Sequence, residues 1–538
     1  MNEKSIKFII YFFLCTSFIV LFVKLFELQI IKGVYYKNLA DGNRIRRVVL
    51  KAPRGEILAR GGELLAKNDK NEEGLYYNPN VGYYVSDTPT EKSRKIASVD
   101  GWKRYYPLKE AASHITGYIG AINEDELGKV STDCPKKGER TLSDVIGRSG
   151  LEEYYDCSLR GADGEKLVEV AADGTYVRLL GEKPSVKGVD LKLTIDYPLQ
   201  EYVSTLLPEI KGMVLVTDSH GEVLALYSSP SYDSNVFLND RDKVSGILND
   251  KSLPLFNRVV SGKYSPGSIF KPIVATAALE TGSIDKNYRY HDTGSINFST
   301  PYGDYSFNNW YFTQYGGVEG DVDVTKALAR STDTFFYKVG ELTGIEEIVG
   351  WSRKFGLSEK TDIDLPGEIE GLVPDPQWKQ EVKGERWFLG NTYHFSIGQG
   401  DLSITPVGIH TALEAIANGG KLCMPHLNSE VQDGDVCKSL DVDPKNIDLV
   451  KEGMEKACSQ GGTAYTFFDF KDKTGIDVAC KTGTAQVGTQ DDTHAWFTAF
   501  APIEEPEIVV TILIEKGGEG SKIAGPVARQ IFDFWFKK

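Results

Sequence analysis

The stretch that decides the fold is Lys263-Tyr264-Ser265-Pro266-Gly267-Ser268-Ile269-Phe270-Lys271. Pro266-Gly267 predicts a turn, and residues 269–280 combine good helix formers with helical apolar spacing. Pro272 is tolerated only in the first turn of a helix, so the helix is expected to start near Ser268. Ser268 and Lys271 then share one helical face, with about 5–6 Å between their Cβ atoms. This arrangement places an amine where it can take the proton of a hydroxyl.

Such a pair needs a lysine that is neutral for part of the time. Burial of Lys271 and a second cation nearby, for which Lys481 is the candidate, would both lower its pKa. Unpaired amides at the helix N-terminus would add hydrogen-bond donors beside Ser268. A serine with a lysine three residues later arises by chance roughly a couple of times in a chain of this length. The Ser268–Lys271 pair therefore indicates a catalytic site only together with two further motifs, which follow it in the sequence.

The second motif, Ser331-Thr332-Asp333, lies between two apolar stretches. This placement predicts a polar loop between two buried helices. Ser331 could relay a proton between Lys271 and Lys481, and Asp333 could bind a substrate amide or hold Lys271. A plain helix N-cap, a common role of serine and aspartate, is the alternative interpretation.

The third motif is a Lys-Thr-Gly triplet, and the sequence contains two of them. Lys473-Thr474-Gly475 is flanked by aspartates and predicts a turn. Lys481-Thr482-Gly483 continues into Thr484 and a β-rich run, with residues 496–500 as the pairing strand, and is therefore assigned to the site. Gly483 would let a ligand backbone come close, as a glycine inside a strand often does.

A site built from these motifs would handle an anionic peptide. Lys481 and Thr484 would face a carboxylate, and the amides of Ser268 and Thr484 would hold an oxyanion. One such donor is typically worth about 3–4 kcal/mol of transition-state stabilisation. The three motifs, in this order and at this wide spacing, are typical of enzymes that acylate a serine with D-alanyl peptides or penicillin.

Composition narrows the class further. The chain has 538 residues, more than one ordinary core holds, so two or more domains are expected. A net charge of −15 argues against a nucleic-acid partner. The seven cysteines form no CxxC pair, and a single histidine lies between Ser268 and Ser331, so no metal or cofactor is expected. Disulfides are permitted if the main body lies outside the cytoplasm; Cys423 and Cys437 are nearest in sequence, and free thiols are the equal alternative.

Residues 8–23 are all apolar, aromatic or small and are flanked by Lys7 and Lys24. With the apolar residues that follow, a membrane anchor over residues 8–30 is expected, since about 20 residues span a bilayer. No small-residue cleavage site follows directly, which favours an uncleaved anchor over a signal peptide. The short residues 1–7 favour a cytoplasmic N-terminus, although flanking charges are nearly balanced. A buried core helix is the alternative.

The rest of the chain divides into a pedestal over residues 31–205 and a catalytic domain over residues 206–538. In the pedestal, residues 51–66 predict two strands around a Gly-Gly turn, a polar tyrosine-rich stretch runs to about 110, and residues 121–145 predict helix and loop. Toward the end of the pedestal, a strand is expected at 191–196 and a helix around 199–207. In the catalytic domain, strands are expected at 212–217, 222–227, 495–500 and 507–514, and a helix from 526. Strands at both ends around helical sequence predict an α+β domain with an antiparallel sheet and helices on its faces.

Short motifs over nearly the whole chain resemble those of class B penicillin-binding proteins, and most closely the elongation-type branch. They are Asn43-Arg-Ile-Arg46, Ala52-Pro-Arg-Gly55, Arg104-Tyr-Tyr-Pro107, Gly117-Tyr-Ile-Gly120, Gly150-Leu-Glu-Glu-Tyr-Tyr155, Leu193-Thr-Ile-Asp196, Ser229-Pro-Ser-Tyr-Asp233, Asn257-Arg258, Ile363-Asp-Leu-Pro-Gly-Glu368, Ile397-Gly-Gln-Gly400, Thr405-Pro406 and Gly483-Thr-Ala-Gln486.

The resemblance implies a penicillin-binding transpeptidase fold: an antiparallel sheet with helices on both faces and an all-helical subdomain, preceded by an elongated pedestal and one transmembrane helix. It implies a D,D-transpeptidase of the plasma or inner membrane that cross-links peptidoglycan stem peptides outside the cytoplasm during wall elongation. β-Lactams would bind covalently. A SEDS-family glycosyltransferase is the implied partner, docked through anchor and pedestal.

The resemblance also implies residue roles. Ser268 is the expected nucleophile and Lys271 its base, with Ser331 and Lys481 as proton-relay partners. Substrate contacts are expected from Asp333, Thr482, Gly483 and Thr484. Asp333 stands where most relatives carry asparagine, which agrees with the elongation-type branch. The pedestal between residues 68 and 105 looks shortened, which puts partner contacts in question but not the chemistry.

Two other function classes remain open from the sequence. The same serine could serve a D,D-carboxypeptidase or a class D-like β-lactamase. A long-lived penicilloyl adduct is expected of the transpeptidase and would be absent for a lactamase, which also has no use for a pedestal of this size. A penicillin sensor or silent scaffold is the third hypothesis. A sensor would need several membrane spans, and hydropathy predicts one.

Overall fold

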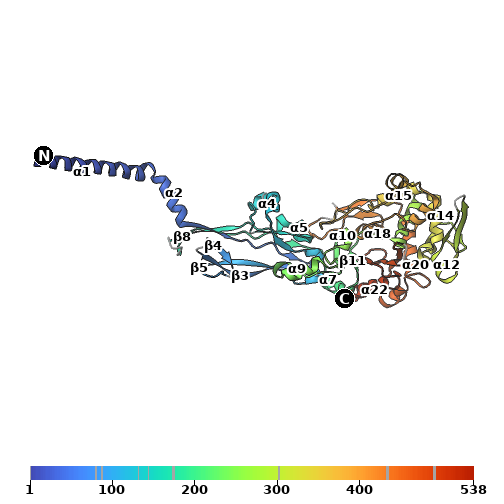
Figure 1. Cartoon of the computed structure of the whole chain (residues 1–538). Coiled ribbons are helices and arrows are strands. Elements are labelled where there is room, and N and C mark those ends of the chain that lie inside the picture. Colours follow the sequence, from blue (N-terminus) through green and yellow to red (C-terminus); the bar gives the residue numbers. More distant parts are fainter. Residues whose placement is uncertain are drawn as a thin grey trace.

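The protein is described here from a computed structural model, which describes residues 2–78, 82–86, 89–130, 133–142, 144–171, 176–300, 303–431, 436–488 and 492–537. The molecule is elongated (Figure 1). A free-standing N-terminal helix forms one end, a strand-rich pedestal the middle, and the larger C-terminal part the other end. The predicted pedestal stretch 68–105 is described except for residues 79–81, 87 and 88, and the region 121–145 except for 131, 132 and 143.

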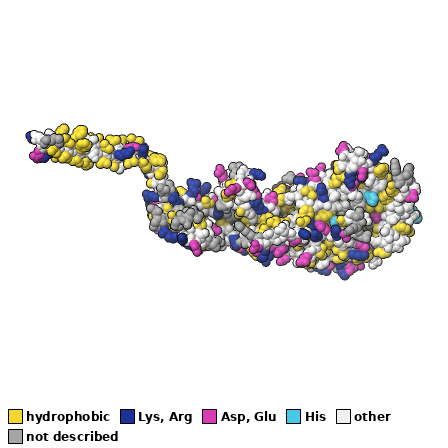
Figure 2. Space-filling view, in the orientation of Figure 1, with side chains coloured by type: hydrophobic (Ala, Val, Ile, Leu, Met, Phe, Trp, Pro, Cys, Tyr) yellow, Lys and Arg dark blue, Asp and Glu magenta, His cyan; other side chains and the backbone are white. Residues whose placement is uncertain are grey.

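The N-terminal helix projects away from the body of the molecule (Figure 1). It consists of α1 (Glu3–Phe26) and the π-helical turn η1 (Glu27–Ile31), and α2 (Gly33–Arg44) follows in a new direction (Figure 1). By length and composition it can cross a membrane. None of its residues is buried, and hydrophobic side chains cover the visible face of α1 (Figure 2). The alternative of a buried core helix is therefore wrong. The helix begins at Glu3 and includes the anchor expected over residues 8–30.

Two larger sheets form most of the pedestal, beside the two-stranded sheet of β6 (Ile119–Ala121) and β7 (Val145–Gly147). One has the strand order β1-β8-β9; the other has the order β10-β2-β3-β4, with β5 also paired to β3. Their bounds are β1 (Ile45–Leu50), β2 (Ile57–Leu58), β3 (Leu64–Asn78), β4 (Gly82–Ser86), β5 (Arg94–Tyr105), β8 (Gly164–Val170), β9 (Tyr176–Lys183) and β10 (Leu191–Lys192). The predicted Gly-Gly turn joins β2 to β3. Long strands β3 and β5 fill the tyrosine-rich stretch, where no strand was predicted because much of this ladder is accessible and its apolar alternation is weak.

Short elements connect the two pedestal sheets. They are η2 (Lys109–Ala111), α3 (Ser113–Thr116), β6 (Ile119–Ala121), α4 (Glu124–Val130), η3 (Pro135–Lys137), β7 (Val145–Gly147), α5 (Gly150–Tyr154) and α6 (Asp156–Leu159). The predicted helix and loop over 121–145 are confirmed by α4 and the turns after it. The strand expected at 191–196 is shorter, ends at Lys192, and runs parallel to β2 in the pedestal.

Pedestal motifs that are distant in sequence meet in a buried cluster that we call the ionic hub: Arg54, Arg104, Arg140, Glu152 and Asp156. Glu152 accepts hydrogen bonds from Nε of Arg54 at 2.7 Å and from Nε of Arg104 at 2.6 Å. Asp156 accepts from Nη2 of Arg54 at 2.6 Å and also pairs with Arg140. Burial by itself raises the pKa of Glu152, but the two guanidinium groups outweigh burial and lower it. Ion pairs thus connect the pedestal segments around residues 54, 104, 140 and 152–156.

The C-terminal part is built on one antiparallel sheet of order β12-β11-β21-β20-β19. The strands are β11 (Gly212–Thr217), β12 (Val223–Ser229), β19 (Ala479–Gln486), β20 (Thr493–Ala501) and β21 (Ile508–Ile514). The predicted hairpin of β11 and β12 and the strands near the C-terminus are confirmed. Because β11 pairs with β21, the two ends of this part meet in the middle of the sheet.

Helices cover both faces of this sheet. On one face lie α11 (Lys271–Glu280) and α18 (Pro406–Ala417), and on the other α7 (Tyr197–Ser204) and α22 (Ala524–Phe536). The predicted helix from residue 526 is confirmed as part of α22, with Val527 and Ile531 buried against the strands. The α+β class and the two-faced sheet are confirmed. α7 packs on β12 and α22, although the predicted boundary at residue 205 leaves it with the pedestal.

A mostly helical region packs beside the first of these faces. Its larger helices are α13 (Val324–Arg330), α14 (Asp333–Thr343), α15 (Ile345–Lys354), α17 (Leu389–Ser396) and α20 (Pro444–Ala457). The subdomain is not entirely helical as predicted, because β13 (Tyr290–Asp292) pairs with β16 (Gly320–Val322), and β14 (Ser295–Thr300) pairs with β15 (Gly303–Asn308). The remaining elements are α8 (Val236–Asn239), α9 (Arg241–Leu248), α10 (Arg258–Ser261), η4 (Gly267–Phe270), α12 (Trp310–Tyr315), α16 (Pro376–Trp378), η5 (Lys379–Lys383), β17 (Lys421–Cys423), β18 (Cys437–Ser439), η6 (Tyr465–Phe467) and α21 (Phe470–Thr474).

Three disulfides link six of the seven cysteines: Cys134–Cys157, Cys423–Cys437 and Cys458–Cys480. The alternative of free thiols at Cys423 and Cys437 is therefore wrong. Cys15 in α1 is unpaired. Such pairing is typical of domains that fold outside a reducing compartment.

Candidate active site

The loop that carries Ser268 is held against two neighbouring segments. The amide of Gly267 donates to the carbonyl of Gly398 at 2.9 Å, and Trp496 Nε1 donates to the carbonyl of Ser265 at 3.0 Å. A 3₁₀ turn, η4, then leads into α11, so the predicted helix begins as expected but with a tighter first turn. The side chain of Ser268 is partly exposed and lines a cavity.

Lys271 lies at the first position of α11 and is fully buried. Its Nζ donates to the carbonyl of Ser331 at 2.8 Å, to Ser331 Oγ at 3.1 Å, and to Asp333 Oδ1 at 2.6 Å. Burial lowers the pKa of Lys271, and the Asp333 carboxylate opposes that shift without cancelling it. Within the described residues, Lys271 makes no hydrogen bond to Ser268, whose hydroxyl is left to the cavity.

Ser331 connects α13 to α14, which confirms the predicted polar loop between two buried helices. It adopts a left-handed conformation, with φ of 55°, and follows the last residue of α13. Asp333 is the first residue of α14, and its second carboxylate oxygen accepts from the Trp310 amide at 2.9 Å. The N-cap alternative is wrong for both residues, because Thr332 occupies that position. Of the two predicted roles of Asp333, holding Lys271 is the one that the contacts support.

Lys481 approaches the same serine from β19. It is fully buried, and its Nζ donates to Ser331 Oγ at 2.9 Å and to the Thr482 carbonyl at 2.9 Å. Burial first, and the charge of Lys271 second, lower the pKa of Lys481 well below its usual value. A neutral lysine amine can accept a proton, and a charged one can donate a proton. Because the Ser331 hydroxyl is hydrogen-bonded to both amines, it can pass a proton from one lysine to the other.

The two Lys-Thr-Gly triplets are clearly separated by their surroundings. Lys481-Thr482-Gly483 lies in β19, in register with β20 as predicted. Lys473 lies in the short helix α21, not in a turn, and its Nζ pairs with the exposed Asp469 at 2.6 Å. It does not line the cavity.

Gly483 has a packing role that sequence reasoning missed. A Cβ atom at this position would lie 2.9 Å from Trp496 Cβ and 3.0 Å from Ile269 Cγ2. The absence of a side chain therefore lets the nucleophile turn lie directly on β19. Gly483 also lines the cavity. The close approach of a ligand backbone at this glycine stays a prediction.

The motifs converge on one cavity of about 510 Å³. Its lining includes Ser268, Ser331, Asp333, Thr482, Gly483 and Thr484. Lining residues that sequence reasoning did not assign include Trp310, Tyr315, His394, Gln399, Thr463 and Lys522. Gln399 belongs to the Ile397–Gly400 motif, which marked it; Thr463 has no local pattern that could have found it. Lys271 and Lys481 lie buried behind this lining.

Among the described residues, Asp133, Cys134 and Cys157 cluster closely enough to hold an ion. These two cysteines are joined in a disulfide in the pedestal, so they offer no thiolate ligand.

A partly exposed serine at a helix start, with two buried lysines hydrogen-bonded to a second serine, is the arrangement of a serine acyltransferase site. A family model described as "Penicillin binding protein transpeptidase domain" matches residues 212–533, and one described as "Penicillin-binding Protein dimerisation domain" matches residues 89–193. The chain belongs to the penicillin-binding protein family, which confirms the resemblance inferred from its motifs.

Curated relatives and solved structures agree with this membership. Peptidoglycan D,D-transpeptidase MrdA of Haemophilus influenzae is 32% identical over 96% of this chain and 89% of its own length. MrdA of Escherichia coli K12 is also 32% identical, over 96% of this chain and 91% of that protein. These relatives confirm the predicted resemblance to the elongation-type branch of the family.

Solved structures extend the similarity to the whole shape. PBP2 of Helicobacter pylori, in a complex with MreC, has a TM-score of 0.78 at 28% identity, covering 92% of this chain and 99% of that one. PBP2 of Pseudomonas aeruginosa, in complex with WCK 5153, has a TM-score of 0.74 at 31% identity, covering 91% and 96%. A structure titled "Structural coordination of polymerization and crosslinking by a peptidoglycan synthase complex" matches with a TM-score of 0.76 at 25% identity, over 100% and 99%.

Proposed function

We propose that the chain is a peptidoglycan D,D-transpeptidase that uses Ser268 as its nucleophile. The observation that carries the proposal is the position of Ser331 Oγ, 3.1 Å from Lys271 Nζ and 2.9 Å from Lys481 Nζ, beside a cavity that Ser268 lines. The names of the curated relatives support the same activity.

The reaction follows from the groups in place. Ser268 Oγ attacks the carbonyl carbon of the penultimate D-alanine of a stem peptide while Lys271 takes the hydroxyl proton. The amides of Ser268 and Thr484 hold the oxyanion, and the terminal D-alanine leaves as its nitrogen takes up a proton. An amine of a neighbouring stem peptide then attacks the ester, which forms the cross-link and frees Ser268.

Three groups on the strand side of the cavity suit the substrate carboxylate. Thr482 and Thr484 offer hydroxyl groups that line the cavity, and Lys481 adds a buried amine behind them. The 2.6 Å contact of Asp333 Oδ1 with Lys271 Nζ supports a role of Asp333 in holding that amine. A β-lactam would acylate Ser268 in the same way and remain attached, because its leaving group stays tethered.

A fluorescent penicillin tests the assignment of the site. It should label the intact chain covalently, and Ser268→Ala should abolish the label. Lys481→Ala should slow acylation by about 10²-fold or more, as loss of a general acid–base group does, whereas the matched Lys473→Ala should not. Label retained on the Ser268 variant would refute the nucleophile, and an unchanged rate in Lys481→Ala would refute the choice of triplet. A lactamase would instead release the label quickly.

The proposed location is the plasma or inner membrane, with residues 1–7 in the cytoplasm and the catalytic domain outside. The three disulfides support an oxidising surrounding for the body of the chain. Protease added to intact spheroplasts should digest the domain; full protection of residues 31–538 would contradict this orientation.

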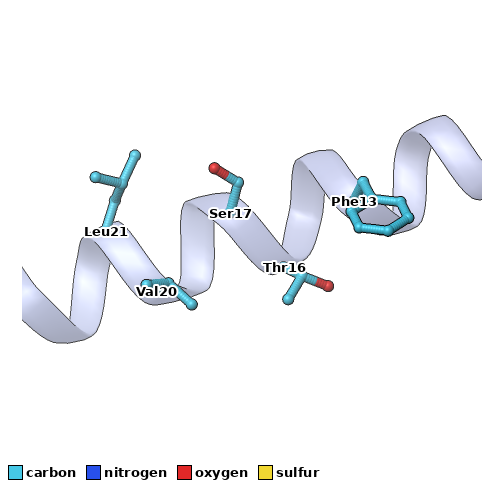
Figure 3. A pocket seen from close by; sticks show the side chains of 5 residues that line it. All are labelled: Phe13, Thr16, Ser17, Val20 and Leu21. Atoms are coloured by element: carbon cyan, nitrogen blue, oxygen red, sulfur yellow. The ribbon is translucent and has the colours of Figure 1, made fainter.

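We infer a SEDS-family glycosyltransferase as partner, docked through α1 and the pedestal. The match to a peptidoglycan synthase complex supports this inference. A pocket on α1 is lined by Phe13, Thr16, Ser17, Val20 and Leu21, of which Thr16 and Ser17 carry small side chains (Figure 3). Small residues of this kind let another membrane helix pack closely. Co-purification with such a glycosyltransferase should weaken in a Thr16→Leu/Ser17→Leu variant; undiminished binding would count against docking through this face.

A further inference from the structure

The Cys458–Cys480 disulfide lies directly beside the proposed site, and no step of the proposed reaction uses it. Cys480 precedes Lys481 in β19, and Cys458 is the C-cap of α20. Both cysteines are buried, 4% and 0% exposed, in the core on one face of the sheet. Because alternate residues of a strand face opposite sides, Lys481 points to the other face, toward Ser331.

β19 needs an attachment of this kind because it is the last strand of its sheet. It pairs with β20 on one side only, and the nucleophile turn η4 packs against it near Gly483. An edge strand lacks the second ladder of hydrogen bonds that holds a central strand in place. The position of Lys481 therefore depends on contacts from outside the sheet.

Helix α20 provides those contacts and also fixes the other half of the site. A Cβ atom at Gly453 would lie 2.8 Å from the Leu328 side chain, so α20 and α13 are in close contact. Lys456 Nζ donates to Thr325 Oγ1 at 2.9 Å across the same interface. α13 ends directly before Ser331, so α20 joins the helix that presents Ser331 to the strand that presents Lys481.

A second attachment lies on the other side of Lys481. Thr482 Oγ1 donates to Thr463 Oγ1 at 2.8 Å, and Thr463 follows Cys458 in the loop after α20. Arg330 Nη1 donates to the carbonyl of Gly461 in that loop at 2.8 Å. The residues immediately before and after Lys481 are thus both tied to the segment 458–463.

We propose that the Cys458–Cys480 disulfide is a positioning device that sets the contact between Lys481 Nζ and Ser331 Oγ, so that the site reaches its full acylation rate only after oxidation. This inference rests on the function proposed above. Forming the bond removes two electrons and two protons from the two thiols; a disulfide oxidant takes them up and leaves as two thiols. The enzyme would therefore be slow in a reducing compartment and fast in an oxidising one.

The test compares two paired variants of the full-length chain in detergent. Cys458→Ala/Cys480→Ala removes the proposed device, and Cys423→Ala/Cys437→Ala removes a disulfide whose cysteines do not line the cavity. Acylation by fluorescent penicillin is resolved into a binding constant and a first-order acylation step. The acylation step should slow about tenfold or more in the first variant, since a shift of about 1 Å can cost about 10²-fold, with binding little changed. The second variant should react like the wild type.

A redox experiment on one polypeptide separates positioning from misfolding. In a chain that keeps Cys458 and Cys480 as its sole cysteines, the rate should be low when prepared with reductant and recover after oxidised glutathione is added. Equal rates in the two states, or equal slowing in the Cys423/Cys437 variant, would overturn the proposal.

The outcome is distinguishable from failure of the proposed function. If the function holds, the slow variants still carry the label on the peptide that contains Ser268. If Ser268→Ala were labelled as well, the site itself would be wrong, whatever the disulfide does.

Discussion

At the scale of single residues, Asp333 sets the proton affinity of the proposed base. Its carboxylate lies 2.6 Å from Lys271 Nζ, and the charge raises a pKa that burial lowers. Only the neutral amine can accept the Ser268 proton, so acylation should rise with pH through the pKa of Lys271.

Asp333→Asn should therefore move the acidic limb of the acylation rate to lower pH. The amide keeps the shape of the side chain but removes the charge that favours protonated Lys271, and the limb should shift by roughly one pH unit or more. The measurement is the second-order rate constant for a fluorescent penicillin across the pH range. Asp321→Asn is the matched control, because that exposed carboxylate pairs with His291. A shift to higher pH would contradict the assigned role.

At the scale of elements, the site depends on how closely the nucleophile turn η4 lies against β19. The close approach of Ile269 and Trp496 to Gly483 leaves no room for a methyl group. The strand edge and the turn are therefore positioned by packing as well as by hydrogen bonds.

Gly483→Ala should push these two elements apart. We expect the free energy of unfolding to fall by about 1–3 kcal/mol, as overpacking does, and acylation to slow about tenfold or more. Thermal unfolding and penicillin acylation measure the two effects. Gly181→Ala in β9 is the control, since a Cβ there meets nothing within 4 Å. Wild-type kinetics in Gly483→Ala would show that the close approach is not needed.

At the scale of the whole molecule, the pedestal lies between the apolar N-terminal helix and the C-terminal part (Figure 1), and the ionic hub joins segments within that pedestal. Glu152 is 0% exposed and neutralises two guanidinium groups, so its loss would leave buried charge without compensation. No hub residue lines the catalytic cavity.

Glu152→Leu should lower the free energy of unfolding by about 3–5 kcal/mol, because one partner of a buried charge cluster is removed. At temperatures where the variant is folded, penicillin should still acylate Ser268 at the wild-type rate. Differential scanning calorimetry and labelling measure the two quantities. Glu72→Gln, which removes an exposed pair with Lys95, should leave unfolding unchanged. An equally small effect of Glu152→Leu would contradict the structural role of the hub.

The amino-acid sequence alone determined the chemical groups of the site and the elements that carry them. The helix after Ser268, the loop at Ser331, the strand at Lys481 and the apolar helix near the N-terminus follow from neighbours a few positions away. Turn residues, helix formers and β-branched runs act locally, so their order in the chain is enough to predict them. The resemblance of many short motifs supplied the family.

Tertiary structure alone decided which distant groups touch. Six cysteines allow about 15 pairings, and nothing local selects the bond beside Lys481. The role of Thr463, the packing role of Gly483 and the ionic hub likewise depend on segments that meet only after folding. Contacts between remote parts of a chain are set by packing and burial of the whole domain, which no short stretch of sequence encodes.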